Sequence, residues 1–213
     1  MSVSIATAVN PPSEKAFRDL DYEIMREAFS VHNQYGHLMD EACYRRALSN
    51  RCSGIDFDRH EEVAIEITHG SFRKIYYIDL LVQRSVILEL KTVEKLHPRH
   101  DSQLLNYLLL CELPYGKLIN FGRPSVESRF VSTSLKRSDR SSFSIKTNAW
   151  QPQSDLCARI PDLLNDLLND LGTHLDYRLY ESAIHTLLSL EELPVAIYDQ
   201  HQIIGQKPMY LLS

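Results

Sequence analysis

The sequence predicts an α/β (α+β) fold in which a central mixed β-sheet is flanked by helices. Two observations lead to this prediction. Segments with apolar residues at every third or fourth position alternate with segments that have them at every second position. Their order is helix, helix, three strands, helix and two strands, as expected for a sheet covered by helices. The 213 residues are also enough to bury the core of such a domain.

Two helices are expected first. Apolar residues recur at helical spacing from Glu14 to about Tyr35, and Gly36 is a typical C-terminal cap. A second helix is predicted from about Leu38 to Ser49, where small residues then break the pattern. The residues before Glu14 lack the features of a signal peptide, and we expect them to form a frayed leader.

Strands and a third helix complete the predicted domain. Three strands are expected in the segments "EEVAIEI", "FRKIYYIDLLV" and "SVILELKTV". The helix is "RHDSQLLNYLLLCE", which lies between Pro98 and Pro114. The segments "YGKLINFG" and "VESRFVS" then predict two short strands.

We expect a domain at residues 14–146 and a C-terminal extension at 147–213, joined by a Ser/Arg-rich linker. The extension has a net charge of −6 and the rest of the chain +1. A helical region is predicted from Leu156 to about Leu190, followed by the extended piece "LPVAIY".

The extension repeats features of the domain start, and we interpret it as a truncated, degenerate second copy. Gly36 and Tyr44 recur 136 positions later as Gly172 and Tyr180, and "EEVAIEI" recurs as "EELPVAI" from Glu191. The acids are not retained, because Tyr177 takes the place of Glu41 and the position of Asp79 falls near Tyr210. The alternative is an unrelated extension, since amphipathic helices match by chance. Either version predicts a role in packing, regulation or homodimerisation rather than catalysis.

Charged residues on two neighbouring strands predict a catalytic centre. Only three residues separate these strands, which predicts a tight antiparallel hairpin centred on Arg84. Asp79 then faces Glu89, and Lys91 projects from the same side as Glu89. Opposed carboxylates repel unless a cation or proton lies between them, and oxygen ligands favour Mg²⁺ or Mn²⁺. The set predicts metal-assisted phosphodiester hydrolysis, in which Lys91 orients water or neutralises charge. Taken alone, the spacing also fits a surface hairpin with an ordinary Glu/Lys pair.

The helix after Pro98 brings further polar residues. Gln103 and Tyr107 share one face at a spacing of four, and His100 lies three residues before Gln103. A polar helical face beside a sheet is expected where it meets a site, and the alternative is a solvated face.

At these residues the sequence resembles the GxxExxY family, an uncharacterised bacterial group assigned to the PD-(D/E)XK nuclease superfamily. The likeness covers roughly residues 20–131 and rests on "GHLMDEACYRRAL", "YYIDLLVQRSVILELKTVEKLHPRHDSQLLNYL" and "GKLINFG". It implies a restriction-endonuclease-like core. It also implies that Glu41 and Asp79 are the first acids and that Glu89 and Lys91 form the ExK pair. The implied metal ligands are Asp79, Glu89 and Glu41, with Gln103 in the catalytic set and Tyr44, His100 and Tyr107 in support.

The predicted function is a metal-dependent nuclease acting on DNA or RNA. The alternative is a catalytically lapsed module that binds nucleic acid or protein. A basic stretch offers weaker candidates for phosphate contact, with a solvated loop as the alternative: Arg123, Lys136, Arg137 and Arg140. No membrane span or signal peptide is expected, and the four dispersed cysteines predict neither a disulfide framework nor a zinc site. These features predict a cytoplasmic protein.

Overall fold

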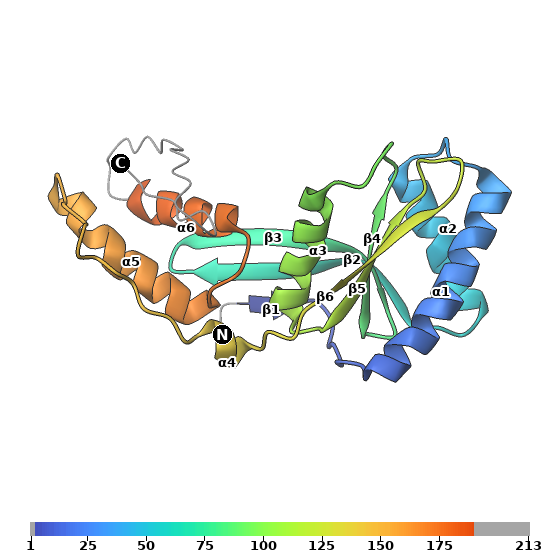
Figure 1. Cartoon of the computed structure of the whole chain (residues 1–213), viewed down its shortest axis with the longest axis horizontal. Coiled ribbons are helices and arrows are strands. Elements are labelled where there is room, and N and C mark those ends of the chain that lie inside the picture. Colours follow the sequence, from blue (N-terminus) through green and yellow to red (C-terminus); the bar gives the residue numbers. More distant parts are fainter. Residues whose placement is uncertain (1–2, 190–213) are drawn as a thin grey trace.

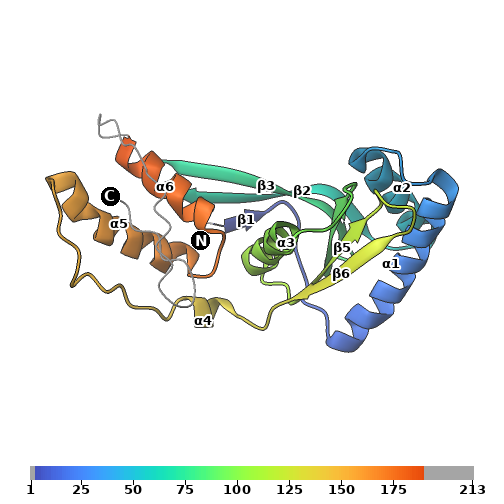
Figure 2. The same cartoon turned by 45° about the horizontal axis from the view of Figure 1, so that its top comes forward.

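The computed structural model describes residues 3–189, and in it the chain is elongated (Figure 1). Figures 1 and 2 show helices α1 (Glu14–Tyr35) and α2 (Glu41–Gly54) at one end of the molecule and α5 (Asp155–Leu171) and α6 (Tyr177–Ser189) at the other, with α3 (Pro98–Cys111) between them. The predicted extended piece "LPVAIY" and the expected repeat that begins at Glu191 lie outside the described residues.

The sheet within residues 3–189 has six strands in the order β1-β2-β3-β4-β5-β6. β4 and β5 run parallel and are joined by a crossover through α3, whereas the other neighbouring strands pair antiparallel. The predicted mixed sheet is thereby confirmed. The strands are β1 (Val3–Ile5), β2 (Arg59–His69), β3 (Phe72–Val82), β4 (Val86–Lys91), β5 (Tyr115–Asn120) and β6 (Glu127–Ser132).

The first strand corrects the prediction of a frayed leader. Val3, Ser4 and Ile5 pair with residues 65–67 of β2, and Val3 and Ile5 pack against the hydrophobic core. Three residues are too short for a period of two to be recognised in the sequence. Here the partner strand supplies the backbone hydrogen bonds, so the sheet extends N-terminal of the predicted domain start at residue 14.

Helix ends follow their capping residues. α1 ends at Tyr35 before Gly36, as predicted. α2 begins at Glu41, later than predicted, because the Asp40 side chain accepts a hydrogen bond from the Cys43 backbone N–H. The single helical region predicted after residue 156 is two helices that break at Gly172, whose φ is 78°. The helices are α1 (Glu14–Tyr35), α2 (Glu41–Gly54), α3 (Pro98–Cys111), α4 (Arg137–Arg140), α5 (Asp155–Leu171) and α6 (Tyr177–Ser189).

Two hydrophobic clusters cover different parts of the sheet. α1 and α2 pack against a cluster that includes Leu80, Leu88 and Leu90. α3, α5 and α6 belong to a second cluster that includes Ile65 and Ile78. In Figure 1 the long β2–β3 hairpin reaches from the main body to α5 and α6. The C-terminal helices therefore extend the core along this hairpin.

The two helical hairpins, α1–α2 and α5–α6, have the same hydrogen bonds at their turns. The Tyr44 hydroxyl donates to the Gly36 carbonyl and accepts from the Met39 backbone N–H. At positions 136 residues later, the Tyr180 hydroxyl donates to the Gly172 carbonyl and accepts from Leu175 N–H. In both, a glycine with positive φ ends the first helix.

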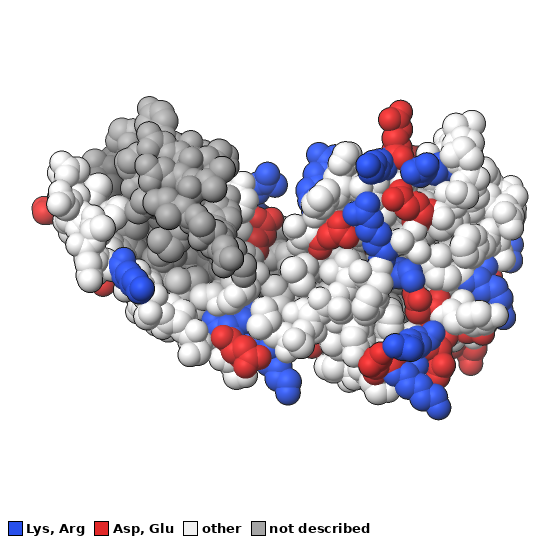
Figure 3. All heavy atoms as spheres, viewed as in Figure 1, with Lys and Arg blue, Asp and Glu red and all other residues white. Residues whose placement is uncertain are grey.

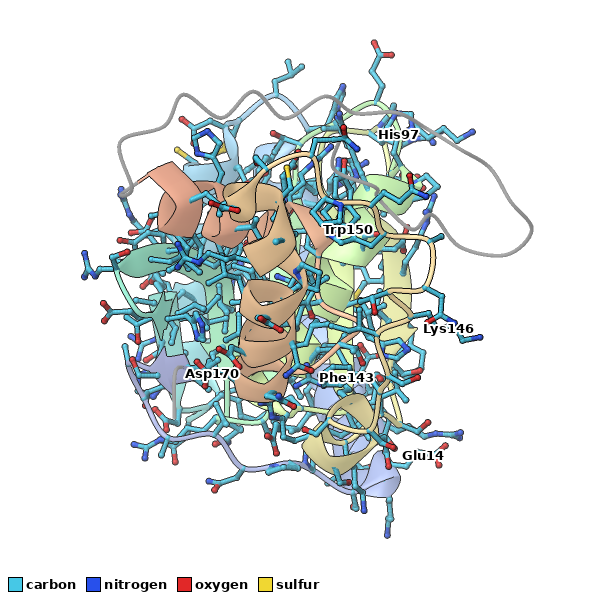
Figure 4. All side chains as sticks on the ribbon, turned by 90° about the vertical axis from the view of Figure 1, so that its left-hand side faces the viewer. Glu14, His97, Phe143, Lys146, Trp150 and Asp170 are labelled. Carbon is cyan, nitrogen blue, oxygen red and sulfur yellow. The ribbon has the colours of Figure 1, made fainter. Side chains whose placement is uncertain are left out.

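The connection to α5 runs along the outside of that helix. Figure 4 labels Phe143, Lys146 and Trp150 on it, and the Trp150 indole N–H donates to the Cys157 carbonyl at 3.1 Å. Near the other end of α5 is Asp170, which Figure 4 also labels; its Oδ2 lies 2.6 Å from Nδ1 of His69 on β2. These contacts tie both ends of α5 to other parts of the chain. Among the described helices, none is both long and apolar enough to cross a bilayer.

Candidate active site

The β3–β4 hairpin has the predicted register. Leu80 pairs with Leu88 and Val82 with Val86, so the next positions along the two strands are Asp79 and Glu89. Gln83 and Arg84 in the turn adopt positive φ, as tight hairpin turns require. The leucines next to Glu89 pack into the cluster under α1 and α2, which leaves Glu89 on the side of α3.

Glu89 is almost completely buried, with 1% of its surface exposed. Its Oε1 accepts hydrogen bonds from Lys91 Nζ at 2.7 Å and from Gln103 Nε2 at 2.6 Å. Its Oε2 is also buried but has no hydrogen-bond partner within residues 3–189. An unpaired buried carboxylate oxygen is costly, so this atom is suited to bind a cation.

Lys91 joins the first helical hairpin to the sheet. Its Nζ lies 3.9 Å from Oε2 of Glu41, the first residue of α2. Burial disfavours the Lys91 ammonium, but the carboxylates of Glu89, Glu41 and Asp79 outweigh burial and raise the Lys91 pKa. Lys91 is therefore held as a cation among three acids.

Asp79 is fixed by a backbone bond and by an arginine that the sequence analysis did not identify. Its Oδ2 accepts from the Leu90 backbone N–H at 2.8 Å, and its Oδ1 lies 3.8 Å from Arg45 Nη1. Arg45 also forms an ion pair with Glu62 at 2.9 Å. The four-residue spacing of Glu41 and Arg45 on α2 was a signal available in the sequence, because it places both on one helix face.

α3 supplies the polar face that was predicted. Gln103 donates to Glu89 and to the Tyr107 hydroxyl, the latter at 3.0 Å, so its amide links the two residues. The Tyr107 ring lies 5.8 Å from the Tyr76 ring, between α3 and β3. Gln103 fixes the rotamer of Glu89 through Oε1.

The environment raises the proton affinity of the acids. Burial raises the pKa of Glu89 to about 8, and the Asp79 carboxylate adds to this rise. Burial also raises the pKa values of Asp79 and Glu41, opposed by hydrogen bonding or by Lys91. When these acids are ionised, their carboxylates repel one another unless positive charge is added between them.

The donor set fits a divalent cation held by two carboxylates. Asp79 and Glu89 offer only oxygen, and the unpaired Glu89 Oε2 is the atom best suited to bind. Within residues 3–189, however, no three His, Cys, Asp or Glu side chains form a group that could hold a metal ion. The three-ligand set implied for Asp79, Glu89 and Glu41 is therefore not assembled. Glu41 instead forms an ion pair with Lys91. Mg²⁺ is commonly bound through one or two carboxylates plus substrate phosphates.

Two of the expected supporting residues have structural contacts. Tyr44 is fully buried, bonds to the α1–α2 turn and stacks on Phe121 with ring centroids 4.5 Å apart. His100 caps the start of α3, because its Nδ1 accepts from the His97 backbone N–H at 3.1 Å. Burial lowers the His100 pKa, which favours its neutral form. Tyr44 and His100 therefore position the helices around the site.

The basic candidates do not form one surface. Arg140 is 3% exposed and donates to the carbonyls of Leu109, Leu171 and Thr173, and Arg137 donates to Asn169 and Asp170 at the end of α5. The expectation that Arg137 and Arg140 contact phosphates is thus corrected, since the terminal carbonyls of α5 need these donors. Arg123 and Lys136 are exposed. Figure 3 shows basic and acidic side chains intermixed on the visible face.

Asn120 and Gly122 contact the segment that follows Lys91, at Thr92 and Val93. Neither residue was predicted from the sequence to be functional. Buried Asn120 accepts from the backbone N–H of Val93 at 3.0 Å and donates to its carbonyl. A Cβ at Gly122 would lie 2.5 Å from the backbone carbon of Thr92. The signal available in the sequence was "GKLINFG", in which a glycine allows close approach of two backbones.

A scan against protein-family models matches residues 18–131, just over half of the chain, to the PD-(D/E)XK nuclease superfamily. The matched range runs from α1 to β6 and contains the carboxylates, Lys91 and Gln103. Searches of curated proteins and of solved structures gave no significant match. Together with the mixed sheet and its flanking helices, the family match shows that this chain belongs to the PD-(D/E)XK nuclease superfamily.

Proposed function

We propose that the protein is a metal-dependent nuclease that hydrolyses phosphodiester bonds at Asp79, Glu89 and Lys91. One observation carries the proposal. A buried Glu89 oxygen without a hydrogen-bond partner in the described chain lies in a site with a second carboxylate and an ammonium group. This arrangement is costly unless it binds a cation and an anionic group.

Each side chain has a distinct part in this proposal. Gln103 and Lys91 hold Glu89 Oε1 and leave Oε2 for the cation, while the Leu90 N–H orients Asp79. Asp79 and Glu89 would hold a divalent cation such as Mg²⁺ or Mn²⁺, whose positive charge would polarise the phosphoryl oxygen and lower the pKa of the attacking water. The Lys91 ammonium stabilises the negative charge that develops on the phosphate. Glu41 keeps Lys91 charged and oriented.

The motifs also support a finer family assignment. We place the chain in the GxxExxY family on the strength of Glu41 and Tyr44, which keep the three-residue spacing of the motif, together with the ExK pair; Leu38 stands where the family usually has a second glycine after Gly36. Tyr44 bonds to the turn carbonyl of Gly36, which brings α2 and its Glu41 to Lys91. The proposed role of the three residues is thus to place one acid.

A second candidate is a nuclease-fold module that binds nucleic acid without cleaving it. The observation that favours it is that no three potential metal ligands come together within residues 3–189. Such a module would bind labelled nucleic acid equally well with or without divalent metal.

A cleavage assay tests the proposed function. Labelled single- and double-stranded DNA and RNA are incubated with Mg²⁺, Mn²⁺ or EDTA. We expect cleavage that requires the metal. Lys91→Ala is expected to lower kcat by about 100- to 1000-fold, as when one charge-stabilising donor is removed. Lys95→Ala, at an exposed position four residues later, is the matched control. Cleavage that persists in EDTA or survives Lys91→Ala contradicts the proposal, and binding without cleavage supports the second candidate.

A further inference from the structure

A groove of about 770 Å³ adjoins the candidate active site and is shared by α3 and the start of α6. On one side it is lined by Lys91, Gln103 and Tyr107, and on the other by His174, Tyr177 and Arg178. The second wall lies outside residues 18–131, the range that matches the superfamily. The C-terminal extension thus completes a groove that the matched domain alone would leave open.

The wall is fixed to α3 by a direct bond. The Asn106 side-chain oxygen on α3 accepts from the Asp176 backbone N–H at 2.9 Å, and Asn106 is buried. The turn before it is held by the bonds of Tyr180 to Gly172 and Leu175. The position of Tyr177 relative to Lys91 is therefore set by several contacts.

The wall also has the same plan as the first hairpin. α2 begins at Glu41 and α6 begins at Tyr177, 136 positions apart, after turns with the same tyrosine and glycine bonds. In the first hairpin this position places a carboxylate 3.9 Å from Lys91, and in the second it places an aromatic ring in the groove that Lys91 lines. The shared bonds support a common origin, with the acid replaced by a tyrosine.

The described lining of the groove holds three cations, Lys91, Arg99 and Arg178, against one acid, Asp176, and it includes aromatic rings. It therefore suits a flexible, anionic ligand with aromatic rings. Tyr177 is 36% exposed, and the Arg178 guanidinium lies 5.5 Å from the centre of its ring. Arg99 on α3 adds a further exposed cation to the lining. Aromatic rings beside cations are the means by which proteins bind single strands, whose unpaired bases stack on them. Because Glu89 is buried and the groove is small, a strand that can bend and expose its bases fits better than a duplex.

We propose that the α5–α6 hairpin is a second copy of α1–α2 that now serves as a binding wall. Single-stranded nucleic acid lies in the groove, with a base stacked on Tyr177 and a backbone phosphate near Arg99. This inference names the substrate class of the proposed nuclease and so rests on the proposed function.

Binding without metal tests the groove separately from catalysis. Labelled oligo-dT and oligo-U of roughly 12 nucleotides are titrated in EDTA and followed by fluorescence anisotropy, with a blunt duplex as comparison. We expect tighter binding of the single strands. Tyr177→Ala is expected to weaken this binding about 10-fold, as for loss of one stacked base, whereas Tyr177→Phe keeps it. Tyr22→Ala removes an exposed tyrosine from α1, outside the groove, and is the matched control.

The salt dependence of binding identifies the phosphate contact. Arg99→Ala is expected to lower the slope of log affinity against log salt by about 0.7, the value for one phosphate contact on a single strand. Equal single-strand affinity for wild type and Tyr177→Ala overturns the inference, as does tighter binding of the duplex or no binding at all. If the single strands bind through Tyr177 but no substrate is cleaved in the metal assay, the proposed nuclease function is wrong, whereas the inference that the groove binds single strands holds.

Discussion

The two helical hairpins follow one backbone plan but contribute differently to the site. α1–α2 packs with the leucines of β3 and β4 and brings Glu41 to Lys91. α5–α6 packs with the cluster of α3 and β2 and brings Tyr177 to the groove. The turns are held by the same tyrosine-to-glycine bonds. The backbone of each hairpin and its contribution to the site are thus set by different residues. The tyrosine-to-glycine bonds determine where the second helix begins, and the first residue of that helix determines whether a carboxylate or an aromatic ring is presented.

The largest expected effect concerns Glu89, the buried acid that the candidate site holds on the side of α3. The pKa of Glu89 rises from 4.5 to about 8 on folding. Between these values the unfolded chain has lost a proton that the folded protein keeps, so the free energy of unfolding of metal-free protein falls as the pH rises. Glu89→Gln has no such proton to lose. In EDTA at pH 8 we expect this variant to be more stable than wild type by on the order of 3 kcal/mol, with little difference at pH 5. Denaturant unfolding at both pH values measures this, and an equal difference at both contradicts the burial argument.

Glu41 and Tyr177 begin the second helix of each hairpin, and moving the acid from one position to the other tests whether the positions are equivalent. Glu41→Ala is expected to lower kcat about 10- to 100-fold, as for removal of a residue that orients a catalytic group. Adding Tyr177→Glu to Glu41→Ala should not restore kcat, because the second hairpin packs with a different cluster and its turn is tied to α3. Steady-state kinetics on a labelled oligonucleotide separates kcat from KM. Recovery of kcat in the double variant would show that the two positions are interchangeable.

A smaller effect compares the glycines that end α1 and α5. Gly36 and Gly172 have φ of 72° and 78°, so alanine is strained at both and is expected to cost about 1 to 3 kcal/mol. A Cβ at Gly36 meets no described atom within 4 Å. At Gly172 it would lie 3.2 Å from Arg140 Cβ and would displace the Arg137 guanidinium, which donates to the carbonyls at the end of α5. Gly172→Ala should therefore lower the free energy of unfolding more than Gly36→Ala. Chemical denaturation of both variants measures the difference, and the reverse order would contradict the packing around α5.

The smallest effect tests the shared tyrosine bonds. Tyr44→Phe and Tyr180→Phe each remove one hydroxyl that bridges a turn, at a cost of about 1 kcal/mol. Tyr44→Phe should cost more, because Tyr44 is fully buried and Tyr180 only partly. Thermal unfolding in parallel ranks the two. No loss in either variant would mean that the turns are held by other contacts.

The sequence predicted the parts of the fold that depend on local pattern. The helix at residues 14–35 has a clear period and a glycine cap, and the short turn after Val82 leaves few registers for the hairpin. The meeting of Glu89 and Lys91 followed from the alternation of a strand, and that of Gln103 and Tyr107 from their spacing on a helix. These features need no knowledge of tertiary packing.

The missed features depend on contacts between distant segments. Arg45 reaches Asp79 only once α2 lies on the sheet, and Arg140 is withdrawn from solvent by the carbonyls of α3 and α5. The groove requires α3 and α6 to lie side by side, although 70 residues separate Asn106 from Asp176. A period in the sequence predicts which face of an element is apolar but not which distant polar group will meet it.

Calorimetric titration of Mn²⁺ into the metal-free protein at pH 8 tests the central claim most directly, that Asp79 and Glu89 together hold a divalent cation. We predict one binding event for the wild type, and its loss in both Asp79→Asn and Glu89→Gln. Glu14→Gln, at an exposed position at the start of α1, should bind as the wild type does. Equal binding by wild type and Glu89→Gln, or no binding by folded wild type, would contradict the account.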